Sequence, residues 1–341
     1  FQRLREEYRT PTSGPGRFLR ATVVALQDIA VASLRRISRS ALGRADDRAL
    51  YFFYDLEICS ITYDVATYLA LAEMERRKRN LQSIHVVIVP GRRLEREPDG
   101  YDNIVGPVER RARVRNLIIP TLSLLPSCKG FTVCESRGQA AAIYRQFAKN
   151  VFPEDYRTGF PIAPEGKELR IRAANGEAVF PMLQAAQSDR EAIRRFLELR
   201  AKGRRVIVIT LREYGYMEKR NSNFDSWLAF ADGLDASRYA VVFVRSTSRA
   251  MEPLFPEGGR HFVCESASAN VGLRMALYES AYLNMAIMHG PMELCWYSEI
   301  SKYLIFLRVG SAPQTDASVL GRNAFEIGNS LPFARDCQRW V

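Results

Sequence analysis

The feature that most constrains the fold is a repeated alternation of short apolar runs with segments whose apolar residues recur at helical spacing. The run 84–89 is rich in β-branched residues and ends at Pro90-Gly91, which is typical of a buried parallel strand. Strands are expected at 50–58, 84–91, 131–134, 205–211, 239–244, 283–288 and 303–307. Helices are expected at 64–74, 108–117, 139–150, 189–202, 224–234 and 271–281. Regular alternation of this kind predicts an α/β fold with mostly parallel sheets.

The length of the chain, 341 residues, predicts more than one domain, because a single hydrophobic core rarely grows beyond about 250–300 residues. Residues 151–182 concentrate prolines and glycines and interrupt the alternation. They are therefore the expected connection between domains, with a short strand at 169–172 inside it. We expect a basic arm at 1–49, a first domain at 50–165 and a second domain at 166–341.

The charge of the chain favours an anionic partner, because 49 Lys and Arg residues outnumber 38 Asp and Glu and give a net charge of +11. Ten Arg and five acidic residues lie within 1–49, which also contains the apolar run 21–34. This run is too short to span a bilayer, which needs about 20 apolar residues. Two interpretations stay open: a helix packed on the first domain with its arginines in water, or a basic helix lying on an anionic membrane surface. Because the sequence begins at Phe1 rather than Met, we expect the natural N-terminus upstream of it.

Motifs for metal, cofactor and nucleic-acid binding are missing from the sequence. The six cysteines are scattered without a CxxC pair, which suits a reducing compartment, and the chain has three histidines. There is no Asp-x-Asp pair, no GxxxxGK[ST] phosphate loop and no GxGxxG turn. No zinc finger, RNA-binding aromatic motif or basic zipper accompanies the positive charge. We expect no metal, no cofactor and no nucleic-acid partner, and a cytoplasmic location.

A cluster of cations follows the expected strand 205–211. Arg212, Lys219 and Arg220 lie between this strand and the next helix, which Asn223 is suited to cap. The carboxyl ends of parallel strands form the edge at which α/β sheets bind ligands, and guanidinium groups bind phosphate bidentately. The segment therefore predicts a phosphate site. The alternative is a surface loop whose cations pair with neighbouring glutamates.

A second candidate segment follows the expected strand 283–288. His289, Gly290 and Pro291 come next, and a helix is expected to begin near Met292. Gly290 permits a close approach of the backbone, and the start of a helix exposes N–H groups that bind phosphate. We interpret this segment as a contact for a diphosphate, with a plain structural turn as the alternative.

The order of these segments resembles the C-terminal domain of GT-B glycosyltransferases, most closely the heptosyltransferase-like group. That group has a Lys-Arg-Trp-type segment after the first strand of its second domain. It also has an Asp-Ser/Thr-Gly-Pro-Met-His-Leu-type turn that grips the diphosphate of a nucleotide-sugar. The matching positions here are Lys219, Arg220 and Trp227 for the first motif and 288–294 for the second. The resemblance covers about residues 205–310.

The chain departs from this pattern at three positions. Trp227 is displaced along its helix, and Met288 and Glu293 stand where the family has Asp and His. Arg212 is similar in position to the strand-end arginine of fucosyltransferase-like GT-B enzymes. The resemblance implies two Rossmann-like domains whose parallel sheets face a cleft. The expected donor-binding residues are Arg212, Lys219, Arg220, Asn223, His289, Gly290, Pro291, Met292 and Glu293.

The resemblance also implies a catalytic base. In heptosyltransferase-like enzymes this base is an Asp that opens a helix after the first strand; Asp64 occupies that place here, preceded by Tyr63 where the family has glycine. An inverting transfer needs a base to take the proton of the acceptor hydroxyl as the hydroxyl attacks the anomeric carbon. We expect Asp64 to be this base, with helix capping as its alternative role. Asp55, Glu57 and Asp102 are the other candidates.

Together these features predict a metal-independent, inverting glycosyltransferase that moves a sugar from a nucleotide-sugar donor to a glycan or lipid-linked acceptor in surface polysaccharide synthesis. The expected partners are the donor, the acceptor and an anionic membrane surface. The protein is expected in the cytoplasm, with peripheral binding to the inner face of the cytoplasmic membrane as an option. The alternatives are a nucleotide-sugar epimerase of the same fold and a catalytically silent glycan- or lipid-binding protein.

Overall fold

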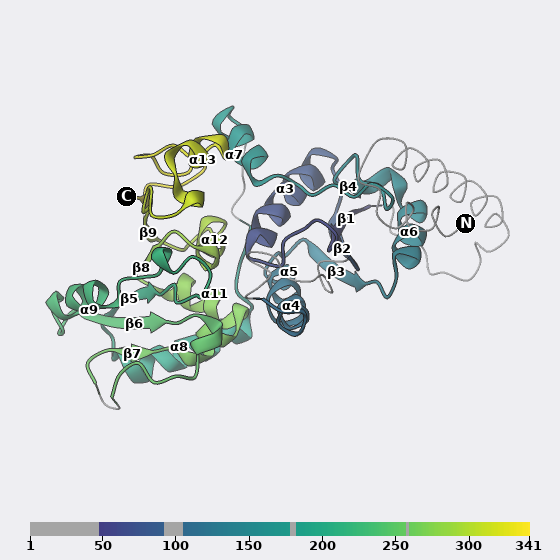
Figure 1. Cartoon of the computed structure of the whole chain (residues 1–341). Coiled ribbons are helices and arrows are strands. Elements are labelled where there is room, and N and C mark those ends of the chain that lie inside the picture. Colours follow the sequence, from purple (N-terminus) through teal and green to yellow (C-terminus); the bar gives the residue numbers. More distant parts are fainter. Residues whose placement is uncertain (1–47, 92–104, 178–181, 257–258) are drawn as a thin grey trace. The chain divides into compact units, whose positions relative to one another are not determined.

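The computed structural model describes residues 48–91, 105–177, 182–256 and 259–341 (Figure 1). All but the last two residues of the expected arm at 1–49 lie outside these ranges, and so does Asp102. Contacts between residues divide the chain into two compact units, which are described separately. Unit 1 comprises Phe1–Cys59, Glu75–Leu94 and Lys129–Ala163. Unit 2 comprises Ser60–Met74, Glu95–Cys128 and Pro164–Val341.

The sheet of unit 1 has four strands in the order β3-β2-β1-β4. Its strands are β1 (Ala49–Asp55), β2 (Ser83–Val89), β3 (Cys128–Val133) and β4 (Val151–Phe152). β1 runs parallel to β2 and to β4, and all of its residues are buried. A strand enclosed on both faces must be apolar along its length, so the aromatic run at its centre suits this position. Ile143 and Tyr144 of α6 (Arg137–Gln146) pack against the same core.

The sheet of unit 2 has six strands in the order β10-β9-β8-β5-β6-β7, and every neighbouring pair is parallel. Its strands are β5 (Arg205–Thr210), β6 (Tyr239–Val244), β7 (Phe262–Val263), β8 (Leu283–Ile287), β9 (Tyr303–Phe306) and β10 (Gln338–Trp340). Taken from β7 to β10, this is the strand order of the Rossmann fold. β6 and β7 follow β5 on one side of the sheet. The chain then returns to the centre, where β8 pairs with the other edge of β5, and β9 and β10 follow on that side. The predicted fold class, an α/β protein with two Rossmann-like parallel sheets, is confirmed.

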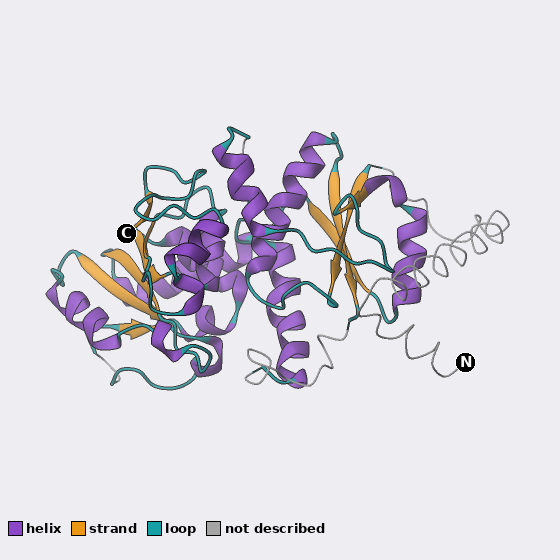
Figure 2. Ribbon diagram, turned by 45° about the horizontal axis from the view of Figure 1, so that its top comes forward, coloured by secondary structure: helices purple, strands orange, loops and turns teal. Residues whose placement is uncertain are grey.

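The helices pack beside the strands of each sheet (Figure 2). Besides α6, they are α3 (Asp64–Lys78), α4 (Pro107–Arg113), α5 (Ile119–Ser123), α7 (Gly166–Ala174), α8 (Gln187–Ala201), α9 (Phe224–Gly233), α10 (Glu265–Ala269), α11 (Val271–Ser280), α12 (Glu293–Trp296) and α13 (Ala317–Arg322). A π-helical turn, η3 (Val114–Ile118), joins α4 to α5, and the 3₁₀ turns are η4 (Ala148–Asn150), η5 (Glu218–Arg220), η6 (Thr247–Arg249), η7 (Gly290–Met292) and η8 (Pro313–Thr315). Within the described ranges, no helix is both long enough and apolar enough to cross a membrane.

Two of the elements that differ from the sequence-based expectation are α7 and β10. The strand predicted at 169–172 is wrong, because these residues belong to the helix α7. The Leu-Arg-Ile-Arg pattern alternates as a strand does, but it is flanked by Lys, Glu and Ala, which favour helix. β10 was not predicted, since a strand of three residues is too short to show an alternation.

A buried ion pair lies in unit 1, at the end of β1. The Asp55 side chain is fully buried and accepts two hydrogen bonds from the Arg137 guanidinium, both of 2.8 Å. The Tyr156 hydroxyl donates a third hydrogen bond to Asp55, of 2.7 Å, and the Glu57 backbone N–H donates a fourth. Burial and the adjacent Asp55 carboxylate raise the pKa of Tyr156, so its hydroxyl keeps its proton. The oxygens of the Asp55 carboxylate are therefore occupied by hydrogen bonds from other groups of unit 1.

Asp55→Ala is expected to destabilise the protein by about 2–4 kcal/mol, because it leaves the fully buried Tyr156 hydroxyl and the partly exposed Arg137 guanidinium without their carboxylate acceptor. The free energy of unfolding can be measured by urea denaturation followed by circular dichroism. Glu191→Ala is the control, since Glu191 pairs with Arg194 and Arg195 on the exposed surface of α8. Equal effects of the two substitutions would contradict a structural role for the Asp55 network.

Candidate functional site

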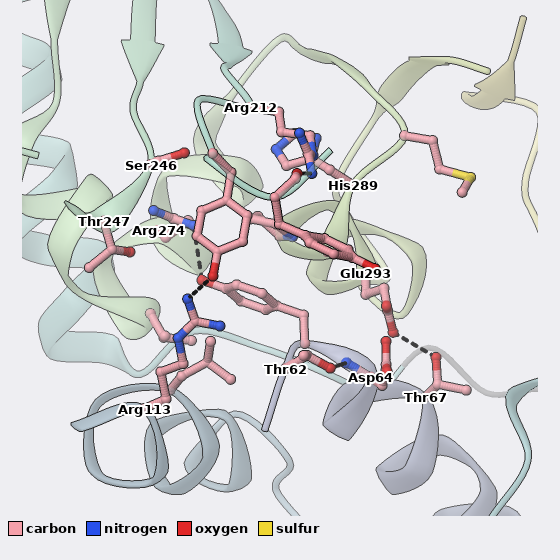
Figure 3. Close-up of a pocket in the computed structure, with 18 of the residues that line it drawn as sticks. Thr62, Asp64, Thr67, Arg113, Arg212, Ser246, Thr247, Arg274, His289 and Glu293 are labelled. Carbon is pink, nitrogen blue, oxygen red and sulfur yellow. Dashed lines mark hydrogen bonds between the residues drawn. The ribbon is translucent and has the colours of Figure 1, made fainter. Parts of the chain in front are cut away.

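A cavity of about 700 Å³ opens at the carboxyl ends of the strands of unit 2, and all of its lining residues belong to that unit (Figure 3). Leu211 and Arg212, which follow β5, line it together with Met288 and His289, which follow β8. β5 and β8 are the neighbouring strands from which the chain departs in opposite directions. Loops that leave this point diverge, and ligands of α/β proteins bind in the opening between them. The volume is that of a site for a small molecule.

The charge of the cavity lining is strongly positive. Its cationic residues are Arg113, Lys167, Arg170, Arg212, Arg220, Arg245 and Arg274. Its acidic residues are Asp64, Glu109 and Glu293. Ion pairs neutralise part of this charge: Arg113 with Glu109, at 2.8 Å, and Arg245 with Glu213. The remaining cations favour an anionic ligand.

Arg212 is a buried side chain that shapes the wall of the cavity. Its guanidinium donates hydrogen bonds to the backbone oxygens of Met217 and Tyr216 and to the side-chain oxygen of Asn221. These bonds hold the segment 213–221 in place, including Met217 in the left-handed backbone region. The side chain therefore combines a structural role with a positive charge at the cavity.

Arg220 joins the two loops at the centre of the sheet. Its Nη2 donates a hydrogen bond of 3.3 Å to the backbone oxygen of Met288, and burial lowers the pKa of its guanidinium. Among the residues that the structure describes, it makes no ion pair. Its guanidinium retains further N–H donors at the cavity, so Arg220 is suited to bind an anionic group.

The other predicted donor-binding residues fall into two groups. His289, Gly290, Pro291 and Glu293 line the cavity with Arg212 and Arg220, as does the predicted base Asp64. Lys219 is exposed on η5, Asn223 caps α9 by accepting a hydrogen bond from the Ser226 N–H, and Met292 is fully buried; none of these three lines the cavity.

The turn at Gly290 is packed against an aromatic ring. A Cβ added to Gly290 would lie 3.2–3.3 Å from atoms of Tyr63, so only glycine fits there without a shift. The Tyr63 hydroxyl accepts a hydrogen bond of 2.9 Å from Arg274, whose other N–H groups donate to the backbone oxygens of Ala267 and Ser268. Tyr63, which stands where the resembling family has glycine, is thus built into this wall of the cavity.

His289 is a neutral imidazole that presents a hydrogen-bond acceptor. Its Nδ1 lies 2.7 Å from the backbone oxygen of Ile287, so Nδ1 carries the proton and Nε2 carries a lone pair. Burial is the main cause of a pKa of His289 lowered to about 3, and the nearby charges of Arg274, Arg212 and Arg220 contribute to this value. Within the described part of the chain, the buried Nε2 has no hydrogen-bond partner. It can accept a hydrogen bond from a ligand group such as a hydroxyl or an amide N–H.

The two carboxyl groups of Asp64 and Glu293 point toward each other in the cavity wall (Figure 3). Asp64 begins α3 and accepts a hydrogen bond of 2.8 Å from the Ser60 hydroxyl. Glu293 begins α12, is 7% exposed and accepts a hydrogen bond of 2.7 Å from Thr67. Burial is the largest cause of a pKa of Glu293 well above its ordinary value, and the neighbouring Asp64 raises it further. Asp64 is the half-buried member of the pair that is accessible from the cavity.

The rival candidates for a base differ in environment. Asp55 belongs to unit 1, where Arg137 and Tyr156 occupy its oxygens. Glu57 follows the same strand and donates its backbone N–H to Asp55. Asp102 lies outside the described residues. Among the described carboxylates that the sequence singles out as bases, Asp64 is the one that lines the cavity.

Several cavity residues were not predicted from the sequence: Thr67, Arg113, Arg170, Arg245, Ser246, Thr247 and Arg274. A signal existed for one group, because residues 245–247 directly follow the predicted strand 239–244, as Arg212 follows its strand. Arg113, Arg170 and Arg274 lie within helices. An arginine in a helix has the same local pattern whether it faces water or a cavity, so no sequence signal distinguishes them.

No group of three or more His, Cys, Asp or Glu residues that could hold a metal ion occurs among the described residues.

Among solved structures, the chain is similar to a glycosyl transferase family 9 protein from Veillonella parvula. The TM-score is 0.50 at 10% sequence identity, over 76% of this chain and 80% of that chain. The wall teichoic acid polymerase TagF is also matched, with a TM-score of 0.26 at 11% identity over 86% of this chain and 79% of that chain. No protein-family model matches the sequence, and no curated protein matches it significantly. The similarity to the family 9 protein is one of fold.

The stability of the protein is expected to fall with decreasing pH because His289 is held neutral. Its pKa of about 3 lies below its ordinary value of 6.5, so between these values the unfolded state binds one more proton than the folded state. From pH 7 to pH 5, the wild type should lose about 1–2 kcal/mol more stability than His289→Asn. Urea denaturation at the two pH values measures this difference, and equal losses in both proteins would contradict a neutral, buried His289.

Proposed function

We propose that this protein is a glycosyltransferase that takes a sugar from a nucleotide-sugar donor. The observation that carries the proposal is the cavity at the divergence of β5 and β8, because it combines an excess of arginines with an accessible carboxylate. Arginines at this edge of a Rossmann-like sheet favour a ligand with phosphate groups. The fold that the chain shares with a glycosyl transferase family 9 protein supports transfer of a sugar as the reaction.

In the proposed reaction, Asp64 acts as the general base. Its carboxylate accepts the proton of the acceptor hydroxyl while the hydroxyl oxygen forms a bond to the anomeric carbon of the donor. The bond between that carbon and the diphosphate oxygen breaks, and the nucleoside diphosphate leaves with the bonding electrons. Attack on the face opposite to the leaving group inverts the configuration at the anomeric carbon.

The cations of the cavity stabilise the leaving group in this proposal. Arg220 and Arg212 lie beside the loop at Met288, where the negative charge of the diphosphate would develop. Fixed guanidinium groups can neutralise this charge without a metal ion, so we propose a metal-independent reaction. His289 Nε2 would accept a hydrogen bond from a hydroxyl or N–H group of the donor.

We further propose a glycan or a lipid-linked glycan as the acceptor and surface polysaccharide synthesis as the process. This part of the proposal rests on the resemblance of residues 205–310 to heptosyltransferase-like enzymes. A nucleotide-sugar epimerase would need the same donor site but no acceptor, so product analysis with and without added acceptor distinguishes the two reactions.

Donor binding can be tested by thermal-shift measurements with UDP, GDP, CMP and ADP and with their sugar conjugates. At least one nucleotide is expected to raise the melting temperature, and Arg220→Ala is expected to weaken its affinity about tenfold or more by removing a charged hydrogen-bond donor. Lys219→Ala is the matched control, because the adjacent Lys219 is exposed and does not line the cavity. The absence of stabilisation by every nucleotide would count against both enzyme hypotheses.

Asp64→Asn is expected to lower turnover by a factor of about 10²–10⁴ while nucleotide affinity stays near that of the wild type, because the amide keeps the shape of the side chain but cannot take a proton. The measurement is release of nucleoside diphosphate from the stabilising nucleotide-sugar, with nucleotide affinity from the thermal-shift titration as the control. Full turnover in Asp64→Asn would exclude Asp64 as the base.

A further inference from the structure

The carboxyl groups of Asp64 and Glu293 are directed at each other (Figure 3), and a hydrogen bond between two carboxyl groups requires a proton on one of them. An ionised carboxylate has acceptor atoms only, so two carboxylates cannot bond to each other. The surroundings of the two groups differ, and they determine which one holds the proton.

Asp64 lies among hydrogen-bond donors at the first residue of α3, a helix of 15 residues. The Ser60 hydroxyl donates to Asp64 Oδ2, and the Thr62 hydroxyl donates in turn to Ser60 at 3.0 Å. The side chain is also half-exposed at the cavity, where water can reach it.

Burial favours the protonated form of Glu293, and its effect exceeds the opposing effect of the hydrogen bond that the Thr67 hydroxyl donates to Glu293 Oε2. The Tyr297 hydroxyl, 2.8 Å from Thr67, must then donate to Thr67. Burial raises the pKa of Tyr297, so its hydroxyl keeps its proton.

The charged and titratable groups that face Glu293 are Asp64 of α3, Arg170 of α7 and Tyr297 after α12. Arg170 makes no ion pair with Glu293: its Nε donates to the backbone oxygen of Asn323 at 2.7 Å, and its guanidinium lies 4.0 Å from the ring centre of Phe325. A buried carboxylate without a paired cation is costly, whereas a buried carboxylic acid is not.

We propose that Glu293 is a positioning residue that keeps its proton and donates it in a hydrogen bond to Asp64, which directs the Asp64 carboxyl group at the cavity. The catalytic consequence rests on the proposed function. During transfer the proton of the acceptor hydroxyl goes to Asp64 and then to solvent, while the proton of Glu293 stays where it is. A protonated Glu293 supplies this hydrogen bond without adding a charge to the site.

Infrared spectroscopy tests the proposal without any substrate, because a protonated carboxyl group has a carbonyl band that a carboxylate lacks. At pH 7, Glu293→Gln is expected to lose the band of one buried carboxylic acid relative to the wild type. Glu279→Gln is the matched control: the side chain of Glu279 is only 3% exposed, but unlike Glu293 it forms an ion pair, with Arg190 at 2.7 Å. The control is expected to leave the band unchanged.

An unchanged band in Glu293→Gln would overturn the proposal. Asp64→Asn provides a second check, because Glu293 remains buried in it and the band should persist with a shifted frequency. Loss of the band in Asp64→Asn together with its retention in Glu293→Gln would place the proton on Asp64 and also overturn the proposal.

A kinetic measurement tests the consequence for catalysis with the nucleotide-sugar that is turned over. Glu293→Leu removes the donor to Asp64, so kcat/KM should fall about tenfold or more. Glu293→Gln retains an N–H donor and should restore most of this loss. Equal losses in the two variants, or wild-type kcat/KM in Glu293→Leu, would contradict positioning through Asp64. If no nucleotide-sugar is turned over, the proposed function fails while the infrared result still decides where the proton lies.

Discussion

The site of this protein depends on a topological constraint, the adjacency of β5 and β8 in the sheet of unit 2. Because β5 starts the sheet and β8 restarts it on the other side, the segments that follow these two strands must diverge. An opening therefore exists at this edge whatever side chains occupy it. Arginines of the segments that follow β5 and β6 and of the surrounding helices line this opening, together with a turn at Gly290 that packs against the Tyr63 ring.

Most cations of the cavity are fixed by backbone oxygens rather than by carboxylates. Arg212 and Arg274 each donate several hydrogen bonds to carbonyl groups, and Arg220 donates to Met288. A carbonyl oxygen orients a guanidinium but does not cancel its charge. The positive potential is thus organised before a ligand arrives, which lowers the reorganisation needed on binding.

The sequence predicted the alternating elements well, because buried strands such as β1 and β5 leave continuous apolar runs. It also predicted the two segments at the centre of the edge, since Arg212 and His289 directly follow strands that could be recognised. Prediction from the sequence failed where the local residue pattern does not reflect the environment in the fold. Residues 169–172 alternate as a strand does but form a helix, and the sequence around Arg274 does not distinguish it from a helical arginine that faces water. The bond between Asp64 and Glu293 joins residues 229 positions apart, and no local pattern contains such a contact.

The tautomer of His289 has a consequence for selectivity. A lone pair placed among arginines repels a fully ionised phosphate oxygen, although the arginines around it attract one. A fully ionised anion such as sulfate can therefore satisfy the guanidinium groups but not the imidazole edge. A ligand that satisfies both must carry its negative charge and a hydroxyl or N–H group on the same small framework, as sugar phosphates and nucleotides do. The imidazole edge thus adds a requirement for a hydrogen-bond donor to the requirement for negative charge.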